Sequence, residues 1–175
     1  MSDARFAHLD PYTYEGEDVV ICLAYWNEMR GERFAPSWRE FDWNRIPSQI
    51  IPFFTVVDIG RDPASATYRF FGTALTRAHG HDMTGRSPLE LEPADMGQSF
   101  FEQYLEVAGK REPLLYTSVL HERAGRSAIA ETALRLPFSK DGETVTQIVN
   151  FADLRKDFEA ARKKFVEDKR ESATP

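Results

Sequence analysis

Two histidines and an aspartate stand close together in one short segment of the chain: His79, His81 and Asp82. Imidazole and carboxylate groups bind metal ions, and His121 farther along could add a ligand. A spacing of two places both histidines on one face of a strand, but it fixes nothing in a turn. There is no HExxH motif, and the single cysteine, Cys22, cannot build a cysteine zinc cluster. We therefore predict no metal site.

Catalytic patterns are equally sparse. Ser118, Ser127 and His121 do not form a recognisable nucleophile–base pair. No glycine-rich phosphate loop is present, and the acidic residues are not paired in a motif for acid–base work. The chain is predicted not to be an enzyme. The alternative is a small pocket enzyme of isomerase-like type, with Asp58 or Tyr104 acting inside an apolar pocket.

Length and charge bound the class of protein. The 175 residues suit one domain with one core, and a hydrophobic content of 42% is ordinary for a soluble globular protein. The formal net charge of −6 argues against a large phosphate-binding surface, so no nucleic-acid partner is expected. The N-terminus does not resemble a signal peptide, and no apolar run approaches the roughly 18 to 20 residues of a membrane span. A cytoplasmic location without membrane insertion is predicted.

Hydrophobic spacing divides the chain into four parts. We expect an irregular arm over 1–16, a helix and connector over 17–52, a mixed core over 53–152, and a charged helix with a tail over 153–175. In the core, periodicity predicts five strands, at 53–59, 67–71, 114–122, 127–138 and 144–151. Helices are predicted between the second and third strands, at 73–78 and 94–108.

The middle strand of the last three carries two distinct faces. Its small and aliphatic residues alternate with Glu131 and Arg135, so the face without the charges is the better core candidate. That face holds Ala128, Ala130, Thr132, Leu134 and Leu136.

This order of elements, five antiparallel strands with helices inserted after the second, resembles the PAS domain. PAS domains follow their second strand with a small-residue turn, a short helix and two glycines, which here are Gly72, Gly80 and Gly85. A closer likeness is to a bacterial family of stand-alone PAS-like proteins of largely unknown function. Its pattern is matched by Tyr25-Trp26, by Arg69-Phe70-Phe71-Gly72-Thr73 and by Gly80-His81-Asp82-Met83-Thr84-Gly85. The resemblance implies an α+β fold with a PAS-like five-stranded antiparallel sheet, plus N- and C-terminal helices.

The glycine-rich motif is read chiefly as a determinant of the fold. Glycines permit positive φ angles and close backbone approach. Asp82 and Thr84 can bond nearby backbone N–H groups and fix the turn. Thr73 is predicted to cap the short helix that begins after Gly72.

The resemblance also implies a function, that of a sensory or regulatory module in signal transduction that binds a small ligand, a protein, or both. PAS cores often leave a cavity between the sheet and the long helix. Small and aromatic residues could line it here: Tyr68, Phe70, Tyr104, Tyr116, Ala130 and Thr132. A filled core without a ligand is the alternative.

No cofactor is expected to be obligatory, although a small metabolite could bind. Haem-binding PAS domains normally use a histidine on the long helix, and 94–108 contains none, which disfavours haem. Blue-light flavin PAS domains use a cysteine on the short helix after the second strand. Cys22 lies instead in the first helix and is read as a small buried residue.

The terminal helices are the expected contact surfaces for a signalling partner or for a homodimer. The apolar stripe of Val19, Leu23 and Trp26 would either cover the outer sheet face or pair with its copy. At the other end, an Asp-hydrophobic signature begins the charged helix with Asp153 and Leu154, and Phe158 continues its apolar seam.

Overall fold

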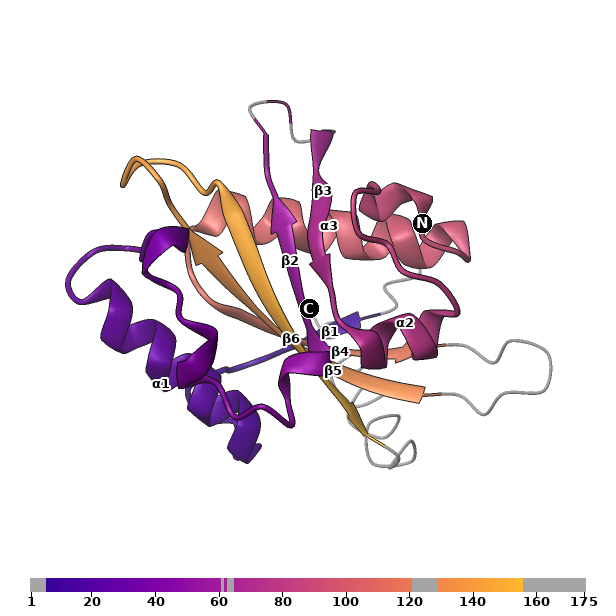
Figure 1. Cartoon of the computed structure of the whole chain (residues 1–175), viewed down its shortest axis with the longest axis horizontal. Helices are drawn as coiled ribbons and strands as arrows, with labels where there is room; N and C mark the ends of the chain where they lie inside the picture. The colour runs from indigo at the N-terminus through magenta and orange to yellow at the C-terminus, as the bar shows by residue number, and fades with distance from the viewer. Residues whose placement is uncertain (1–5, 61, 63–64, 121–128, 156–175) are drawn as a thin grey trace, which may run out of the picture.

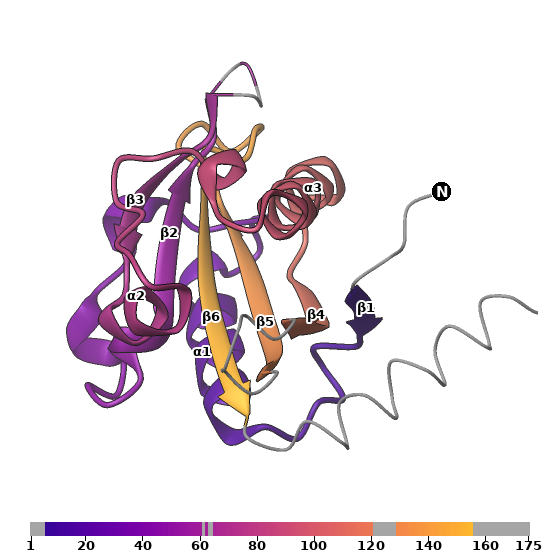
Figure 2. The same ribbon diagram turned by 90° about the vertical axis from the view of Figure 1, so that its right-hand side faces the viewer.

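A six-stranded antiparallel sheet forms the centre of the protein, whose structure is a computed structural model describing residues 6–60, 62, 65–120 and 129–155. The strand order is β1-β4-β5-β6-β2-β3. Figure 2 shows β1 beside β4 at one edge and β3 at the other. The strands are β1 (Phe6–Leu9), β2 (Phe54–Asp58), β3 (Thr67–Phe71), β4 (Leu114–Leu120), β5 (Ile129–Phe138) and β6 (Gln147–Arg155).

Helices cover both faces of this sheet (Figure 1). One face, called the outer face, packs against α1 (Glu17–Arg30) and its connector. The opposite, inner face packs against α2 (Thr73–His79) and α3 (Ala94–Lys110). Short 3-10 turns complete the connections: η1 (Trp38–Glu40), η2 (Trp43–Arg45), η3 (Ile51–Phe53) and η5 (Pro88–Glu90).

The helix predicted for 17–30 is confirmed, and its apolar stripe faces the chain's own sheet. Val19, Leu23 and Trp26 are buried in the outer-face core. The Trp26 indole Nε1 donates a 2.8 Å hydrogen bond to the carbonyl oxygen of Pro137 in β5. The stripe therefore covers the outer face. The alternative prediction, that it forms a dimer interface, is wrong because these side chains are already buried within one copy.

The N-terminal arm, predicted to be irregular, contains a strand. Residues Phe6–Leu9 pair antiparallel with β4, with Phe6 opposite Ser118 and Leu9 opposite Leu115. The expected five-stranded sheet thus gains a sixth strand at its β4 edge. A four-residue strand with mixed burial carries too little periodicity to be recognised alone.

The last strand extends farther than predicted. Asp153 lies opposite Thr132 and Leu154 lies opposite Glu131, so both belong to β6 and not to a helix beginning at 153. Backbone pairing with β5 prevails there over the helical spacing of the sequence. Phe158 lies outside the described residues.

The glycine-rich motif behaves largely as predicted. A Cβ at Gly72 would lie 2.2 Å from the carbonyl oxygen of Pro52, which makes this a true close approach of two backbone segments. Gly80 and Gly85 have φ values of 94° and 81°, in the left-handed region that favours glycine. The Gly85 N–H donates to the Tyr68 carbonyl oxygen at 2.7 Å, which docks the motif against β3.

The turn inside the motif is held by a carboxylate. Oδ1 of Asp82 accepts the Thr84 N–H at 2.8 Å and the Thr84 hydroxyl at 2.7 Å, which lowers the pKa of Asp82. The capping role predicted for Thr73 is wrong. Gly72 is the N-cap residue of α2 and no side chain caps it, while the Thr76 hydroxyl bonds to the Gly72 carbonyl at 3.2 Å.

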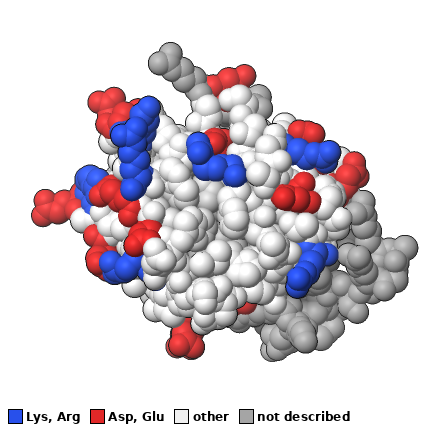
Figure 3. Space-filling model, viewed as in Figure 1, with Lys and Arg blue, Asp and Glu red and all other residues white. Residues whose placement is uncertain are grey.

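Charges of both signs are interspersed on the face of the molecule shown in Figure 3, around a centre with few charged groups. Among the described residues, no helix is long and apolar enough to cross a bilayer.

Candidate functional site

The predicted pocket residues are divided between the two faces of the sheet. Tyr68, Tyr104 and Tyr116 meet in the inner-face core, where the hydroxyls of Tyr68 and Tyr104 are 3.2 Å apart. Phe70 packs in the outer-face core beside Trp43.

The two predicted β5 members do not join the tyrosines. Thr132 shares the outer face with Leu134 because side chains alternate along a strand. Ala130 lies in β5 opposite Arg155, and its side chain is outside the part of the chain that is described. The expected single wall therefore consists only of the three tyrosines.

A buried arginine occupies the middle of the inner face instead. Arg135 in β5 is 2% exposed, and its Nε and Nη2 both donate to Oε1 of Gln103 on α3. Its Nη1 donates to Oδ1 of Asn150 in β6 at 3.0 Å. The amide of Asn150 in turn donates to the Thr55 hydroxyl in β2 at 2.7 Å. One guanidinium thus connects the helix with neighbouring strands of the sheet.

Three aromatic rings surround the same guanidinium. Its Cζ lies 4.5 Å from the ring centroid of Tyr104, 5.3 Å from that of Phe100 and 5.6 Å from that of Tyr116. Ring faces attract a cation, more strongly where water is excluded. None of the described carboxylates forms an ion pair with Arg135. Among the described residues, the direct contacts of this buried guanidinium are therefore amide oxygens and ring faces.

Glu131 is the second buried charged residue on the inner face. It is 4% exposed, and its Oε2 has no hydrogen-bond partner. Burial raises the pKa of Glu131, and the positive charge of Arg135 opposes that rise. Ala133 stands between the two on the same face of β5, with Ala152 beside it in β6. We call Thr55, Gln103, Glu131, Arg135 and Asn150 the inner-face cluster.

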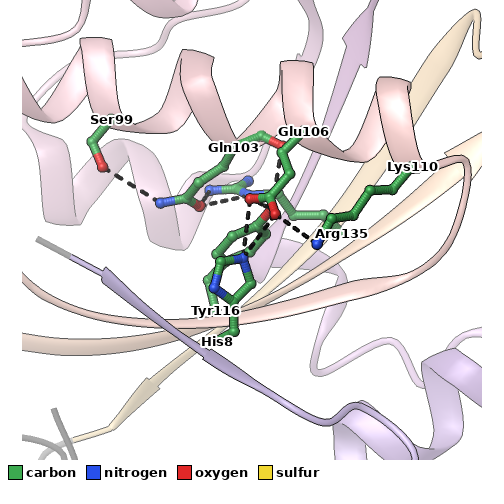
Figure 4. Close-up of polar contacts among 7 residues, drawn as sticks. All are labelled: His8, Ser99, Gln103, Glu106, Lys110, Tyr116 and Arg135. Carbon is green, nitrogen blue, oxygen red and sulfur yellow. Dashed lines mark hydrogen bonds and ion pairs between the residues drawn. The ribbon is translucent and has the colours of Figure 1, made fainter. Parts of the chain in front are cut away.

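A second network lies where α3 meets β4 and the added strand β1 (Figure 4). Glu106 on α3 accepts the Tyr116 hydroxyl at 2.9 Å, and its carboxylate lies 3.0 Å from Nε2 of His8. Lys110 pairs with the same carboxylate at 2.9 Å. Burial opposes ionisation of Glu106, but bonds from Lys110, Tyr116 and His8 prevail and lower its pKa. We call His8, Glu106, Lys110 and Tyr116 the edge network.

The histidines of the glycine-rich motif do not gather with other metal-binding side chains in the part of the chain that the structure describes. His79 is buried between the rings of Phe71 and Phe100, and burial lowers its pKa to about 4. His81, on the next turn, is only partly buried. Within the described residues, no three histidine, cysteine or acidic side chains gather to hold a metal ion, and His121 lies outside them.

Cys22 lies on α1 in the outer-face core, so the sheet separates it from α3. Burial raises the pKa of its thiol to about 12, and the charge of Asp18 adds to that rise. Asp58, one of the residues considered for an enzyme, pairs with Arg69 at 2.9 Å at the sheet edge and is partly exposed. Tyr104, the other, is bonded to Tyr68.

The inner-face cluster was missed because its two charges were read as marking a solvent face. In fact both faces of β5 are buried, as the burial of Glu131, Arg135 and Leu134 shows. A signal was present in the sequence: Arg135 stands between Leu134 and Leu136, in a strand of a sheet that was predicted to have a helix over each face. His8 and Glu106 gave no such signal, since they are far apart in the chain and meet only in the folded protein.

Comparison with solved structures finds light-oxygen-voltage domains. A domain described in work on a flavin analogue aligns with a TM-score of 0.51 and 11% identity, over 67% of this chain and 87% of that one. The aureochrome1 light-oxygen-voltage domain, a blue-light photoreceptor, aligns with a TM-score of 0.49 and 9% identity, over 69% of this chain and 94% of the other. At 11% identity, the first of these two likenesses shows the fold alone.

Comparison with curated proteins found no match. A sequence profile described as a PAS domain matches residues 19–151, which include most of α1, the sheet strands β2 to β5, most of β6 and both inner-face helices. This match spans most of the chain and agrees with the strand order and with the helices inserted after β3. The chain belongs to the PAS domain family.

Proposed function

We propose that this protein is a sensory or regulatory module that binds a small molecule between α3 and the inner face of its sheet. The observation that carries the proposal is the buried guanidinium of Arg135, which lacks an ion pair with any described carboxylate. A buried charge is costly unless it is paired. Amide oxygens and ring faces offset part of that cost, and a ligand that supplies an anionic group would offset more.

The inner-face cluster is also connected to the sheet edge. The Tyr116 ring lies against the Arg135 guanidinium, and its hydroxyl bonds to Glu106, which also contacts His8 of β1. A ligand that moves Arg135 or α3 would therefore alter the contact that holds β1. We propose that the signal leaves by this route, through protein contact with a signalling partner or with a second copy of the chain.

Native mass spectrometry of freshly purified protein, with an absorption spectrum of the same sample, tests the proposal. A sensor that retains its ligand gives an added mass that disappears when the protein is denatured. Visible absorption would identify a chromophore. If no added mass is found, thermal unfolding is measured against a metabolite panel of acidic, neutral, cationic and zwitterionic compounds. Failure of every compound to raise Tm would contradict ligand sensing.

Multi-angle light scattering, with and without the ligand found, tests the second part. A ligand-dependent change in mass would support signalling through a second copy. An unchanged mass would leave a different protein as the partner, to be sought by cross-linking through β1. A ligand that leaves both the mass and the exchange of β1 amides unchanged would contradict the proposed route.

A further inference from the structure

The inner-face cluster presents a cation and an unpaired acid on one side of one strand, and we propose that its ligand is a small zwitterion. Its anionic group pairs with Arg135 and its ammonium group pairs with Glu131. This assignment rests on the proposed function, and it names the class of ligand that this site takes.

The Arg135 end has bonding capacity left over. A guanidinium carries five N–H groups, two of them on each terminal nitrogen. Gln103 accepts one bond from Nε and one from Nη2, and Asn150 accepts one bond from Nη1. One N–H on each terminal nitrogen therefore has no acceptor among the described residues. A carboxylate accepts two N–H groups from one guanidinium, in pairs stronger than those with amide oxygens.

The Glu131 end lacks a donor. Its Oε2 is buried without a hydrogen bond, and leaving a buried acceptor unsatisfied costs about 1–3 kcal/mol. Arg135 acts on Glu131 electrostatically but forms no ion pair with it. An ammonium group carries three N–H donors and one positive charge. It would supply both the hydrogen bond and the ion pair that this carboxylate lacks.

Two alanines lie on the inner face between these two residues. Ala133 stands between them along β5, with the methyl group of Ala152 beside it in β6 and the Tyr116 side chain beside it in β4. Glu131 and Arg135 are four residues apart on one strand, which separates their Cα atoms by roughly 13 Å. Both side chains are long enough to lean toward a molecule placed over the two alanines. The length of the zwitterion is therefore a variable that experiment can read.

The test uses the full chain and a series of ω-amino carboxylates, from glycine through β-alanine, 4-aminobutyrate and 5-aminovalerate, together with the common L-amino acids. Isothermal titration calorimetry measures each affinity. The tightest zwitterion is then compared with its N-acetyl and carboxamide derivatives, which remove one charge each. We expect both derivatives to bind at least tenfold more weakly than the parent.

Two variants locate the site. Glu131→Gln keeps the shape of the side chain and removes its charge, and it should weaken the zwitterion about tenfold while leaving the N-acetyl derivative unchanged. Arg135→Lys keeps the positive charge but loses the paired N–H groups of the guanidinium. It should weaken the binding of the parent zwitterion and of its N-acetyl derivative alike. Circular dichroism of each variant shows whether it folds. If Arg135→Lys does not fold, Glu131→Gln still decides.

The outcomes are distinguishable. Binding of neutral or purely anionic compounds from the metabolite panel, with no zwitterion among them, would overturn the ligand class and leave the sensor function standing. Equal affinities for the zwitterion and both derivatives would also overturn the class. No binding by any compound of either panel would overturn the class and the proposed function together.

Discussion

Gln103 and Arg135 join the long helix to the middle of the sheet through two hydrogen bonds. Oε1 of the Gln103 amide accepts one bond from Nε and one from Nη2 of the guanidinium, and both residues are buried. The bond is the main polar link between α3 and β5 described above. Within the described residues, this contact supplies two of the three hydrogen bonds that the Arg135 guanidinium makes.

Replacing Gln103 with leucine should therefore destabilise the protein strongly. Gln103→Leu keeps the bulk of the side chain but leaves a buried guanidinium with the single acceptor of Asn150. We expect a loss of about 2–4 kcal/mol in the free energy of unfolding, measured by urea denaturation.

Gln98→Leu is the matched control on the same helix, because Gln98 is exposed and, among the described residues, its side chain bonds only to Glu102. It should change the free energy of unfolding by less than about 0.5 kcal/mol. Equal losses in the two variants would show that the amide does not support Arg135.

Two glycines should respond to alanine in opposite directions. In Gly72→Ala, the added methyl group would lie 2.2 Å from the Pro52 carbonyl oxygen and 2.8 Å from that of Phe54, both backbone atoms. The segments must separate, so we expect a loss of about 2 kcal/mol or more. Gly109, in the last turn of α3, has no atom within 4 Å of an added Cβ.

Gly109→Ala should accordingly stabilise the protein by about 0.5–1 kcal/mol, because alanine loses less backbone entropy in a helix. Thermal unfolding of both variants beside the parent chain measures the two changes. A stable Gly72→Ala variant would show that the approach of Pro52 to this glycine is not a requirement of the fold.

The motif glycines and the first helix illustrate what the sequence reveals. The positive φ angles at Gly80 and Gly85 were predicted from residue type, since few residues other than glycine adopt them. Helix 17–30 was predicted from the spacing of Val19, Leu23 and Trp26. Such features depend on neighbours a few residues apart. Local spacing therefore sufficed to recognise the PAS order of elements.

The candidate site depends on contacts between distant segments, which local spacing does not encode. Glu106 meets His8 although the two are 98 residues apart in the sequence, and Arg135 meets Gln103 only after α3 has packed on β5. The pocket prediction failed for Phe70 because a register irregularity between Val56 and Val57 changes which β3 side chains face inward. Bulges and added edge strands arise from pairing, so periodicity did not reveal them.

His79 should make the protein sensitive to mild acid. Burial holds its pKa at about 4 in the folded state, below the roughly 6.5 of an unfolded chain. Between these values the unfolded chain binds a proton that the folded chain does not, so stability is lost as pH falls from about 6.5 toward 4. The loss from this one group is about 2–3 kcal/mol over that window.

Urea denaturation of the parent chain and of His79→Gln at several pH values between 4 and 7 measures this effect. The difference in free energy of unfolding between the two should shrink or reverse as the pH falls, because the variant has no imidazole to protonate. An NMR titration of the His79 ring gives its pKa directly. A ring that titrates near 6.5 in the folded protein would contradict the prediction.

The contact of His8 with Glu106 should govern the local stability of β1 more than that of the whole domain. His8 is half-exposed, and pairs of this kind contribute at most about 1 kcal/mol. β1 is a short edge strand, and in the sheet formed by the described residues it pairs with β4 alone. His8→Ala should therefore speed amide exchange in Phe6–Leu9 several-fold, while exchange in β5 and β6 stays slow.

Hydrogen exchange followed by mass spectrometry measures this difference. Lys110→Ala is the matched control, because it removes another partner of Glu106 from an exposed position without touching β1. We expect β1 exchange in Lys110→Ala to remain close to that of the parent chain. If Lys110→Ala loosens β1 as much as His8→Ala does, the strand is held by the charge balance of Glu106 and not by the imidazole, and the proposed route from Tyr116 to β1 would need a different last step.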